Sequence, residues 1–183
     1  MRTARPSARA AASAAVLIAL VAVSPALDAQ MTGAKKVATA SIEEHGDELV
    51  DLSLQIWRFA ETALRETQSA ALLADYAEEQ GFRVERGIAG MPTAFTAEYG
   101  KGRPVIGIMG EYDALPGISQ KVQATKEAYE PGAGGHGCGH NLFGPASLGA
   151  AMAIKELIEA GELAGTIRFY GTPAEESVGG KIY

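Results

Sequence analysis

The alternation of apolar and polar positions separates an apolar run near the N-terminus from a longer stretch with helical and strand-like periods. The apolar run covers residues 10–23, follows three arginines and precedes small residues that end at Ala29. Such a segment is typical of a secretory signal peptide, and it is shorter than the about 20 residues that a membrane span needs. We therefore expect residues 1–29 to be a signal peptide and the mature protein to be periplasmic or secreted, with no membrane attachment. An uncleaved N-terminal anchor is the alternative.

Three stretches beyond this segment show apolar residues at helical spacing. Ser41 begins a sequence typical of a capping box, and apolar positions follow as far as Phe59, so we expect a first helix from Ser41 to about Glu61. A second helix is expected over residues 68–79. A third is expected over residues 145–160, where a proline suits the first turn and a glycine follows the end.

Four short runs have the composition of strands: residues 82–86, 93–99, 104–109 and 166–170. Residues 100–103 are rich in glycine, which predicts a hairpin turn between the second and third of these strands. The third strand is apolar on both faces, which is typical of a central strand covered on both sides. Residues 117–135 are polar and irregular, and we expect them to form a loop.

The order of these elements predicts an α/β domain in three layers, with helices on both faces of a sheet. Acidic residues follow the carboxyl ends of two strands, at residues 111–113 and 175–176, where open α/β sheets place ligand sites. Residues 177–183 have the pattern of another helix that has just begun. We therefore interpret residues 30–183 as the N-terminal part of a larger domain.

Composition narrows the class of protein only slightly. The chain has 183 residues, enough for one domain with a hydrophobic core, and a formal net charge of −6. No basic stripe is present, which argues against a nucleic-acid partner. The single cysteine, Cys138, cannot form an internal disulfide. In an exported protein it is therefore buried, paired with another chain or bound to a metal.

The candidate chemistry centres on residues 135–141, which hold the cysteine and two of the three histidines between glycines. In an extended or looped backbone Cys138 and His140 point to the same side, so a thiolate and an imidazole can bind one ion or two neighbouring ions. Zinc accepts both donors, and glycines allow the backbone to fold closely around it. In isolation, a buried cysteine beside a surface histidine is the simpler interpretation; together with the strand-end carboxylates, a metal site is favoured.

Glu175 and Glu176 supply two adjacent carboxylates, one of which can bind a metal while the other acts as general base on metal-activated water. Alone, this pair would be interpreted as acidic residues at a helix N-terminus. Asp113 can orient a metal ligand or contact the metal itself. Glu111 points to the same side as Asp113 and is a weaker candidate.

Four motifs in this order resemble a known family. They are residues 90–95, Gly110-Glu-Tyr-Asp-Ala-Leu-Pro-Gly117, Gly135-His-Gly-Cys-Gly-His-Asn141 and Pro173-Ala-Glu-Glu176. The chain resembles the zinc-dependent aminoacylase, hippuricase and carboxypeptidase-type amidohydrolases, most closely the B-type branch of the aminobenzoyl-glutamate utilisation proteins. The resemblance covers residues 41–183, which is nearly all of the chain after the expected signal peptide.

The resemblance implies a metallopeptidase-like catalytic domain and a role for each candidate residue. Cys138, His140 and Glu176 would be metal ligands, Glu175 the general base and Asp113 the residue that orients the site. The family hydrolyses amide bonds of N-acylated amino acids or small peptides with two divalent metal ions. Zinc is expected, and manganese or cobalt could accept the same donors.

Parts of the family pattern are missing from this chain. The later histidine ligands and the small lid domain through which relatives dimerise are absent, so the resemblance implies a truncated catalytic domain that is inactive alone. The complete protein would be a homodimer or a hetero-oligomer.

Two other functions remain open. Cys138 could be the nucleophile of a hydrolase, activated by His136 or His140. Alternatively, the chain could be a non-catalytic binding or dimerisation module in which a metal serves as a structural staple.

Overall fold

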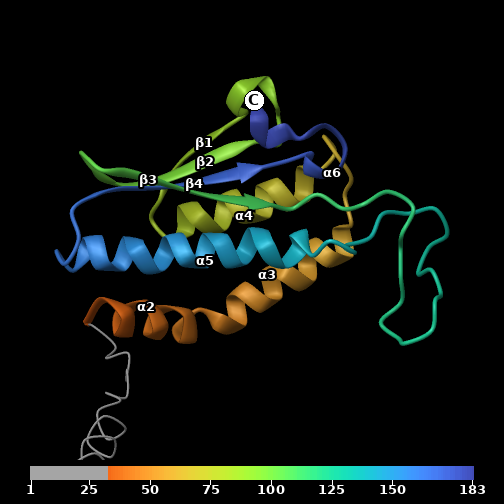
Figure 1. Ribbon diagram of the computed structural model, residues 1–183, viewed down its shortest axis with the longest axis horizontal. Coiled ribbons are helices and arrows are strands. Elements are labelled where there is room, and N and C mark those ends of the chain that lie inside the picture. The colour runs from red at the N-terminus through yellow and green to blue at the C-terminus, as the bar shows by residue number, and fades with distance from the viewer. Residues whose placement is uncertain (1–32) are drawn as a thin grey trace, which may run out of the picture. The chain divides into compact units, whose positions relative to one another are not determined.

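A mixed sheet of four strands organises residues 33–183, the part of the chain that this computed structural model describes (Figure 1). The strands are β1 Arg83–Arg86, β2 Phe95–Lys101, β3 Val105–Glu111 and β4 Gly165–Thr172. Their order is β1-β2-β4-β3, with β3 and β4 parallel and the other neighbours antiparallel. The expected signal peptide, residues 1–29, lies outside the described residues.

The predicted hairpin between β2 and β3 is wrong, because β4 lies between these strands and pairs with both of them. The connection between them passes the start of β4. There the Thr166 amide donates to the Pro104 carbonyl over 2.9 Å, and the Thr166 hydroxyl donates to the Gly102 carbonyl over 3.0 Å. A glycine-rich turn indicates that the chain reverses direction, but it does not indicate whether the two strands that it joins pair with each other or with a third strand between them.

The strand order also places β3 at an edge of the sheet formed by residues 33–183. Val105, Ile106 and Met109 of this strand are each about half exposed. The prediction of a central strand covered on both faces is therefore wrong for this part of the chain. An apolar run reports a preference for burial, and it carries no information about the position of the strand in its sheet.

The helices of the described residues are α2 Gly33–Glu44, α3 Gly46–Phe59, α4 Thr67–Glu79, α5 His140–Glu159 and α6 Glu175–Val178, with 3₁₀ turns η1 Ile88–Gly90 and η2 Gly180–Ile182. α4 and α5 pack against one face of the sheet, and α2 and α3 pack on α5 (Figure 1). The predicted α/β class is confirmed, and α4 matches its predicted range to within one residue.

The predicted first helix begins at the wrong place, because Ser41 lies inside α2 and does not cap a helix. The Ser41 hydroxyl donates to Glu156 Oε1 on α5 over 2.6 Å, so it ties two helices together instead of satisfying its own backbone. α2 and α3 meet at His45, whose ring lies 3.2 Å from Glu48 and 3.6 Å from Glu156. A capping-box pattern inside a helix cannot be distinguished from one at its start without this tertiary contact.

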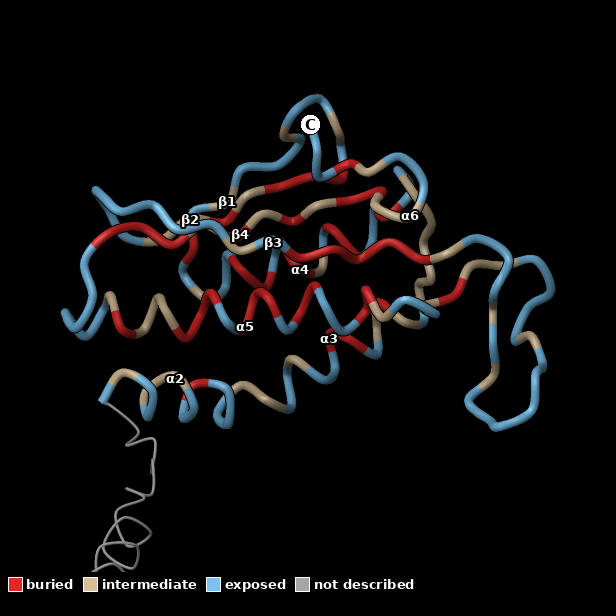
Figure 2. The backbone as a smooth tube through the Cα atoms, in the orientation of Figure 1, coloured by how far each residue is buried: buried red, intermediate tan, exposed pale blue. Residues whose placement is uncertain are grey.

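The hydrophobic core lies between the sheet and the helices beneath it (Figure 2). Ile56, Leu73, Leu148 and Phe169 are among its fully buried side chains. Phe169 of β4 packs on Phe95 of β2 with ring centroids 5.6 Å apart. No helix within residues 33–183 combines the length and the apolar character that crossing a membrane requires.

Candidate metal centre

Two parallel strands bring the acidic motifs to the same edge of the sheet. β3 ends at Glu111 and β4 ends at Thr172, and these two residues are partners in the parallel ladder. The carboxyl ends of parallel strands face the same way, so the loops that follow them meet. Asp113 follows β3 and is 1% exposed, while Glu175 and Glu176 form the first turn of α6 after β4.

The glycine-rich loop reaches this edge through a short backbone pairing. The amides and carbonyls of Leu115 and Gly135 bond to each other, each over 3.0 Å. Gly135 must be glycine, since a Cβ there would lie 2.6 Å from the Ile118 carbonyl oxygen. Gly139 has a φ of +97°, which glycine adopts without strain, and turns the chain into α5.

The sequence predicted that this helix begins at Pro145, but α5 begins at His140. The amides of Leu142 and Phe143 bond to the Gly139 carbonyl over 2.9 and 3.1 Å and start the helix. Pro145 lies inside the helix and is fully buried. His140 consequently stands on the first turn of a long, packed helix, which holds its backbone rigidly.

The structure brings Cys138, His140 and Glu176 together, with one donor atom from each within 4.8 Å of the others. Glu111, His140 and Glu175 form a second group that meets the same limit. His140 Nε2 lies 3.0 Å from Glu111 Oε2 and 3.9 Å from Glu175 Oε2. The weaker candidate of the sequence analysis, Glu111, thus belongs to the same cluster as the stronger ones.

Asp113 connects the two halves of the cluster through both of its carboxylate oxygens. His140 Nδ1 donates to Oδ1 over 2.9 Å, and the Glu176 amide donates to Oδ2 over 2.9 Å. A hydrogen bond from Nδ1 leaves the Nε2 lone pair of a neutral imidazole free to bind a cation. Asp113 thereby orients the His140 ring and holds the backbone of Glu176.

The donor set fits a divalent metal on two observations. His140 Nε2 contacts carboxylates, and a lone pair in that position needs a proton or a cation between the partners. Glu176 Oε1 is buried and has no hydrogen-bond partner among the described residues, although buried polar atoms are nearly always satisfied. Sulfur, nitrogen and carboxylate oxygen are ligands that zinc accepts together.

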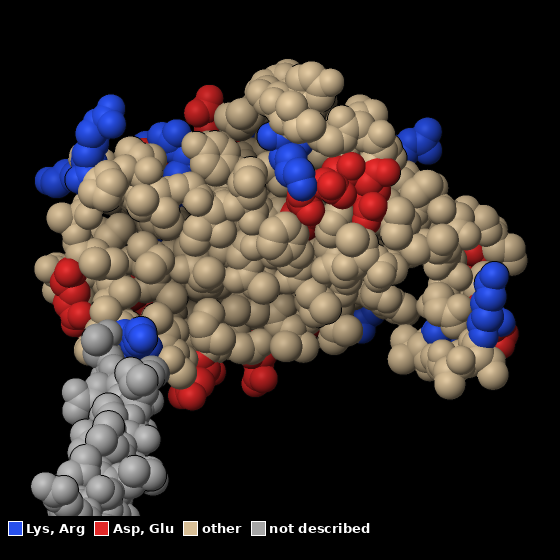
Figure 3. Space-filling view, in the orientation of Figure 1, with Lys and Arg blue, Asp and Glu red and all other residues tan. Residues whose placement is uncertain are grey.

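Lys181 is a neighbour of the cluster that the sequence analysis did not identify. Its ammonium donates to Glu111 Oε1 over 2.6 Å and to Glu175 Oε1 over 3.4 Å. The hydrogen bond to Glu111 raises the pKa of Lys181 and keeps it charged. Figure 3 shows basic and acidic side chains gathered side by side on this face. No motif indicated this lysine, since only the turn after α6 brings it back to the site.

The surroundings of Cys138 disfavour the cysteine-nucleophile alternative. A hydrogen bond with Glu176, the negative charge of that residue and the further carboxylates raise the pKa of the exposed Cys138 thiol. Nucleophilic cysteines instead need a positive environment that stabilises the thiolate.

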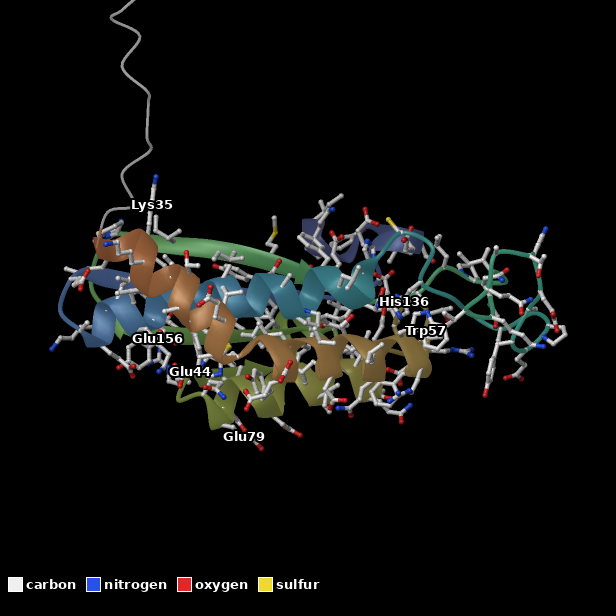
Figure 4. The ribbon with its side chains drawn as sticks, turned by 90° about the horizontal axis from the view of Figure 1, so that it is seen from below. Lys35, Glu44, Trp57, Glu79, His136 and Glu156 are labelled. Carbon is white, nitrogen blue, oxygen red and sulfur yellow. The ribbon has the colours of Figure 1, made fainter. Side chains whose placement is uncertain are left out.

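Both histidines of the motif contact groups other than Cys138. His136 donates from Nε2 to the Ile56 carbonyl over 3.1 Å at the end of α3, where Figure 4 shows it beside Trp57. Burial lowers the pKa of His136 and keeps it neutral. His140 donates from Nδ1 to Asp113, and its Nε2 faces the carboxylates of Glu111 and Glu175.

Residues 107–183, which contain this cluster, match the model of peptidase family M20/M25/M40. The chain is 45% identical over 144 residues to the B-type polypeptide of p-aminobenzoyl-glutamate hydrolase from Escherichia coli strain K12, covering 78% of this chain and 30% of that protein. The chain belongs to the M20/M25/M40 family.

Two further proteins are similar to this chain. It is 32% identical over 162 residues to the human Xaa-Arg dipeptidase, with 77% of this chain and 32% of the relative covered. A Bacillus subtilis structure described as a dinuclear metal binding peptidase from the M20 family superimposes with a TM-score of 0.62 at 26% identity, over 73% of this chain and 36% of that one. The chain spans about a third of the length of the curated relatives it matches.

Proposed function

We propose that this protein is a metal-dependent amidohydrolase. Its substrate would be the amide bond of an N-acyl amino acid, an aminobenzoyl-glutamate-like compound or a small peptide. The observation that carries the proposal is the convergence of Cys138 and His140, at the entry to α5, with Glu176 of α6, beside the partly exposed carboxylate of Glu175. The Escherichia coli relative is named as a hydrolase of p-aminobenzoyl-glutamate, which supports that substrate class.

Two divalent metal ions are proposed for the complete protein, with zinc as the metal and manganese or cobalt as alternatives. Cys138, His140 and Glu176 would hold one ion, and the similar Bacillus subtilis structure is described as dinuclear. Bound metal supplies Lewis-acid chemistry, which lowers the pKa of water to about 7 and polarises the amide carbonyl. The remaining ligands and the oligomeric partner would come from outside residues 33–183.

Three further residues of this chain would each have a separate role in the proposed hydrolysis. Glu175, 29% exposed, offers its carboxylate to solvent at the rim and takes a proton from the attacking water. Asp113, which is buried, keeps the proton of His140 on Nδ1 and fixes the Glu176 backbone, so both ligands stay in place. Lys181 balances part of the negative charge that the carboxylates gather there.

Elemental analysis and a hydrolysis assay together test the proposal. Purified protein is assayed on p-aminobenzoyl-glutamate and N-acetyl amino acids, before and after a chelator and after zinc is restored. We expect bound metal, loss of hydrolysis on chelation and recovery with zinc, whereas Glu175→Gln keeps the metal and loses turnover. Full hydrolysis by a metal-free preparation would refute the proposal, and metal binding without turnover would favour the structural-staple alternative.

A further inference from the structure

Glu66 is a fully buried carboxylate that no step of the proposed chemistry uses. It is 0% exposed and lies immediately before α4. Short polar side chains at that position often cap the helix that follows, but the longer Glu66 side chain makes no such bond. Glu61 does this instead, accepting the amides of Gln68 and Ser69 over 3.0 and 2.9 Å. The side chain of Glu66 is therefore free to point inward.

One oxygen of the Glu66 carboxylate bonds to the backbone of Ala174, the residue before Glu175 and Glu176. The Ala174 amide donates to Glu66 Oε1 over 2.9 Å. Ala174 has a φ of +59°, a left-handed conformation that a residue with a Cβ rarely adopts. On its other side, the Ala174 carbonyl accepts the amides of Val178 and Gly180 over 3.2 and 3.1 Å. Strained conformations of this kind persist only where the surroundings fix them.

The other oxygen of Glu66 reaches the second loop of the site. The Thr93 hydroxyl donates to Glu66 Oε2 over 3.2 Å. The Thr93 carbonyl in turn accepts the hydroxyl of Tyr112, the residue between Glu111 and Asp113. Glu66 thus lies beneath both acidic loops and bonds to a backbone or side chain that supports each of them.

Burial of this carboxylate is costly, which argues that its bonds serve a purpose. Burial raises the pKa of Glu66, and the charge of nearby Asp113 raises it further. Buried carboxylates are rare unless they are paired or hydrogen-bonded. The partners here are the strained Ala174 amide, the Thr93 hydroxyl and the backbone amides of Leu64 and of Glu66 itself, with no cation among the described hydrogen bonds and ion pairs of Glu66.

We propose that Glu66 is a positioning residue of the metal centre, which holds Ala174 in its left-handed conformation and thereby aims Glu175 and Glu176 at the metal. This inference rests on the proposed function for the metal itself. The proposed role depends on the length of the Glu66 side chain, because its bond to the Ala174 amide sets the direction in which α6 begins. The Glu175 carboxylate then lies 3.9 Å from His140 Nε2, and the Glu176 amide donates to Asp113 Oδ2 over 2.9 Å.

Two substitutions of Glu66 separate the effect of side-chain length from the effect of charge. Glu66→Asp keeps the charge and shortens the side chain, so it loses the Ala174 bond. Glu66→Gln keeps the length and an acceptor oxygen and is the conservative rescue. Glu61→Asp is the matched control. It shortens a carboxylate that also lies near the start of α4, but that carboxylate bonds to the first turn of α4 and not to the site. The full chain is used, with zinc as the probe.

Amide exchange of Ala174 and zinc affinity are the two readouts. In Glu66→Asp we expect Ala174 to exchange at least about tenfold faster and zinc affinity to fall by about 10–100-fold, as for other residues that support metal ligands. Glu66→Gln should stay within about threefold of the unaltered protein in both, and Glu61→Asp should leave zinc affinity unchanged. Adding Ala174→Gly to Glu66→Asp should recover part of the affinity, since glycine adopts positive φ without strain.

Each contrary result overturns the inference in a distinct way. Unchanged Ala174 exchange in Glu66→Asp would show that the bond does not hold the turn. Faster exchange with unchanged zinc affinity would leave Glu66 a merely structural residue. No recovery in the double variant would refute the role of the left-handed turn. Absence of zinc binding by the unaltered protein would instead refute the proposed function, and Ala174 exchange alone would then decide whether Glu66 holds the turn.

Discussion

Asp113→Asn is the substitution whose effect follows most directly from the geometry of the site. The side chain is fully buried, and its two oxygens accept hydrogen bonds of 2.9 Å from His140 Nδ1 and from the Glu176 amide. An asparagine of the same shape has only one acceptor oxygen, and its amide group is a donor. The substitution therefore changes hydrogen bonding without changing volume.

Neither orientation of the new amide satisfies both partners. If the oxygen faces the Glu176 amide, the NH₂ group donates to His140 Nδ1 and moves the imidazole proton to Nε2, where it blocks the lone pair for a metal. If the oxygen faces His140, the NH₂ group meets the Glu176 amide, and two donors oppose each other. A buried group left unsatisfied costs about 1–3 kcal/mol. Because about 1.4 kcal/mol is tenfold in affinity, we expect metal binding to weaken by about 10–100-fold.

Competition with a chromophoric chelator measures this affinity for zinc. Thermal unfolding in excess chelator reports separately what the substitution costs the metal-free fold. Asp75→Asn is the matched control, because that side chain is 66% exposed and pairs with Arg86 at the surface. It should leave zinc affinity unchanged. If Asp113→Asn binds zinc within about twofold of the unaltered protein, the reasoning that Asp113 orients His140 is refuted.

Three other predictions follow from the described contacts and from the sequence. Glu61→Ala should lower the free energy of unfolding by about 1 kcal/mol, measured by denaturant titration, because it removes the cap on the amides of Gln68 and Ser69. Burial alone would raise the pKa of Glu61, but the hydrogen bonds from Ser69 and Gln68 outweigh it and lower the pKa. The stabilisation is thus present above the unfolded-state pKa of about 4.3 and is lost as the pH falls through the folded value, so an effect that grows on acidification contradicts the account. Bound zinc should protect Cys138 from iodoacetamide, and a chelator should restore labelling in mass spectra; equal labelling in both states would argue against a thiolate ligand. N-terminal sequencing of exported protein should begin at Gln30, and an intact N-terminus on exported material would contradict the predicted cleavage.

The sequence alone was sufficient to propose most residues of the candidate site. Cys138, His140, Glu175 and Glu176 stand in short motifs whose residue types carry their chemistry locally, and the strand-then-acid pattern around Asp113 predicted where these motifs meet. Local pattern was also sufficient for α4, whose apolar spacing matches one face of a helix. Such features depend on neighbours a few positions apart, and the sequence states those neighbours directly.

Tertiary structure alone decided which distant segments lie together. β4 inserts between β2 and β3 because its hydrogen bonds and apolar face match both, a pairing between residues far apart in the chain. Lys181 joins the carboxylates only because the turn after α6 folds back. The inward direction of Glu66 depends on Glu61 having taken over the cap of α4. Burial and charge pairing of this kind are set by the assembled fold, and no local pattern reports them.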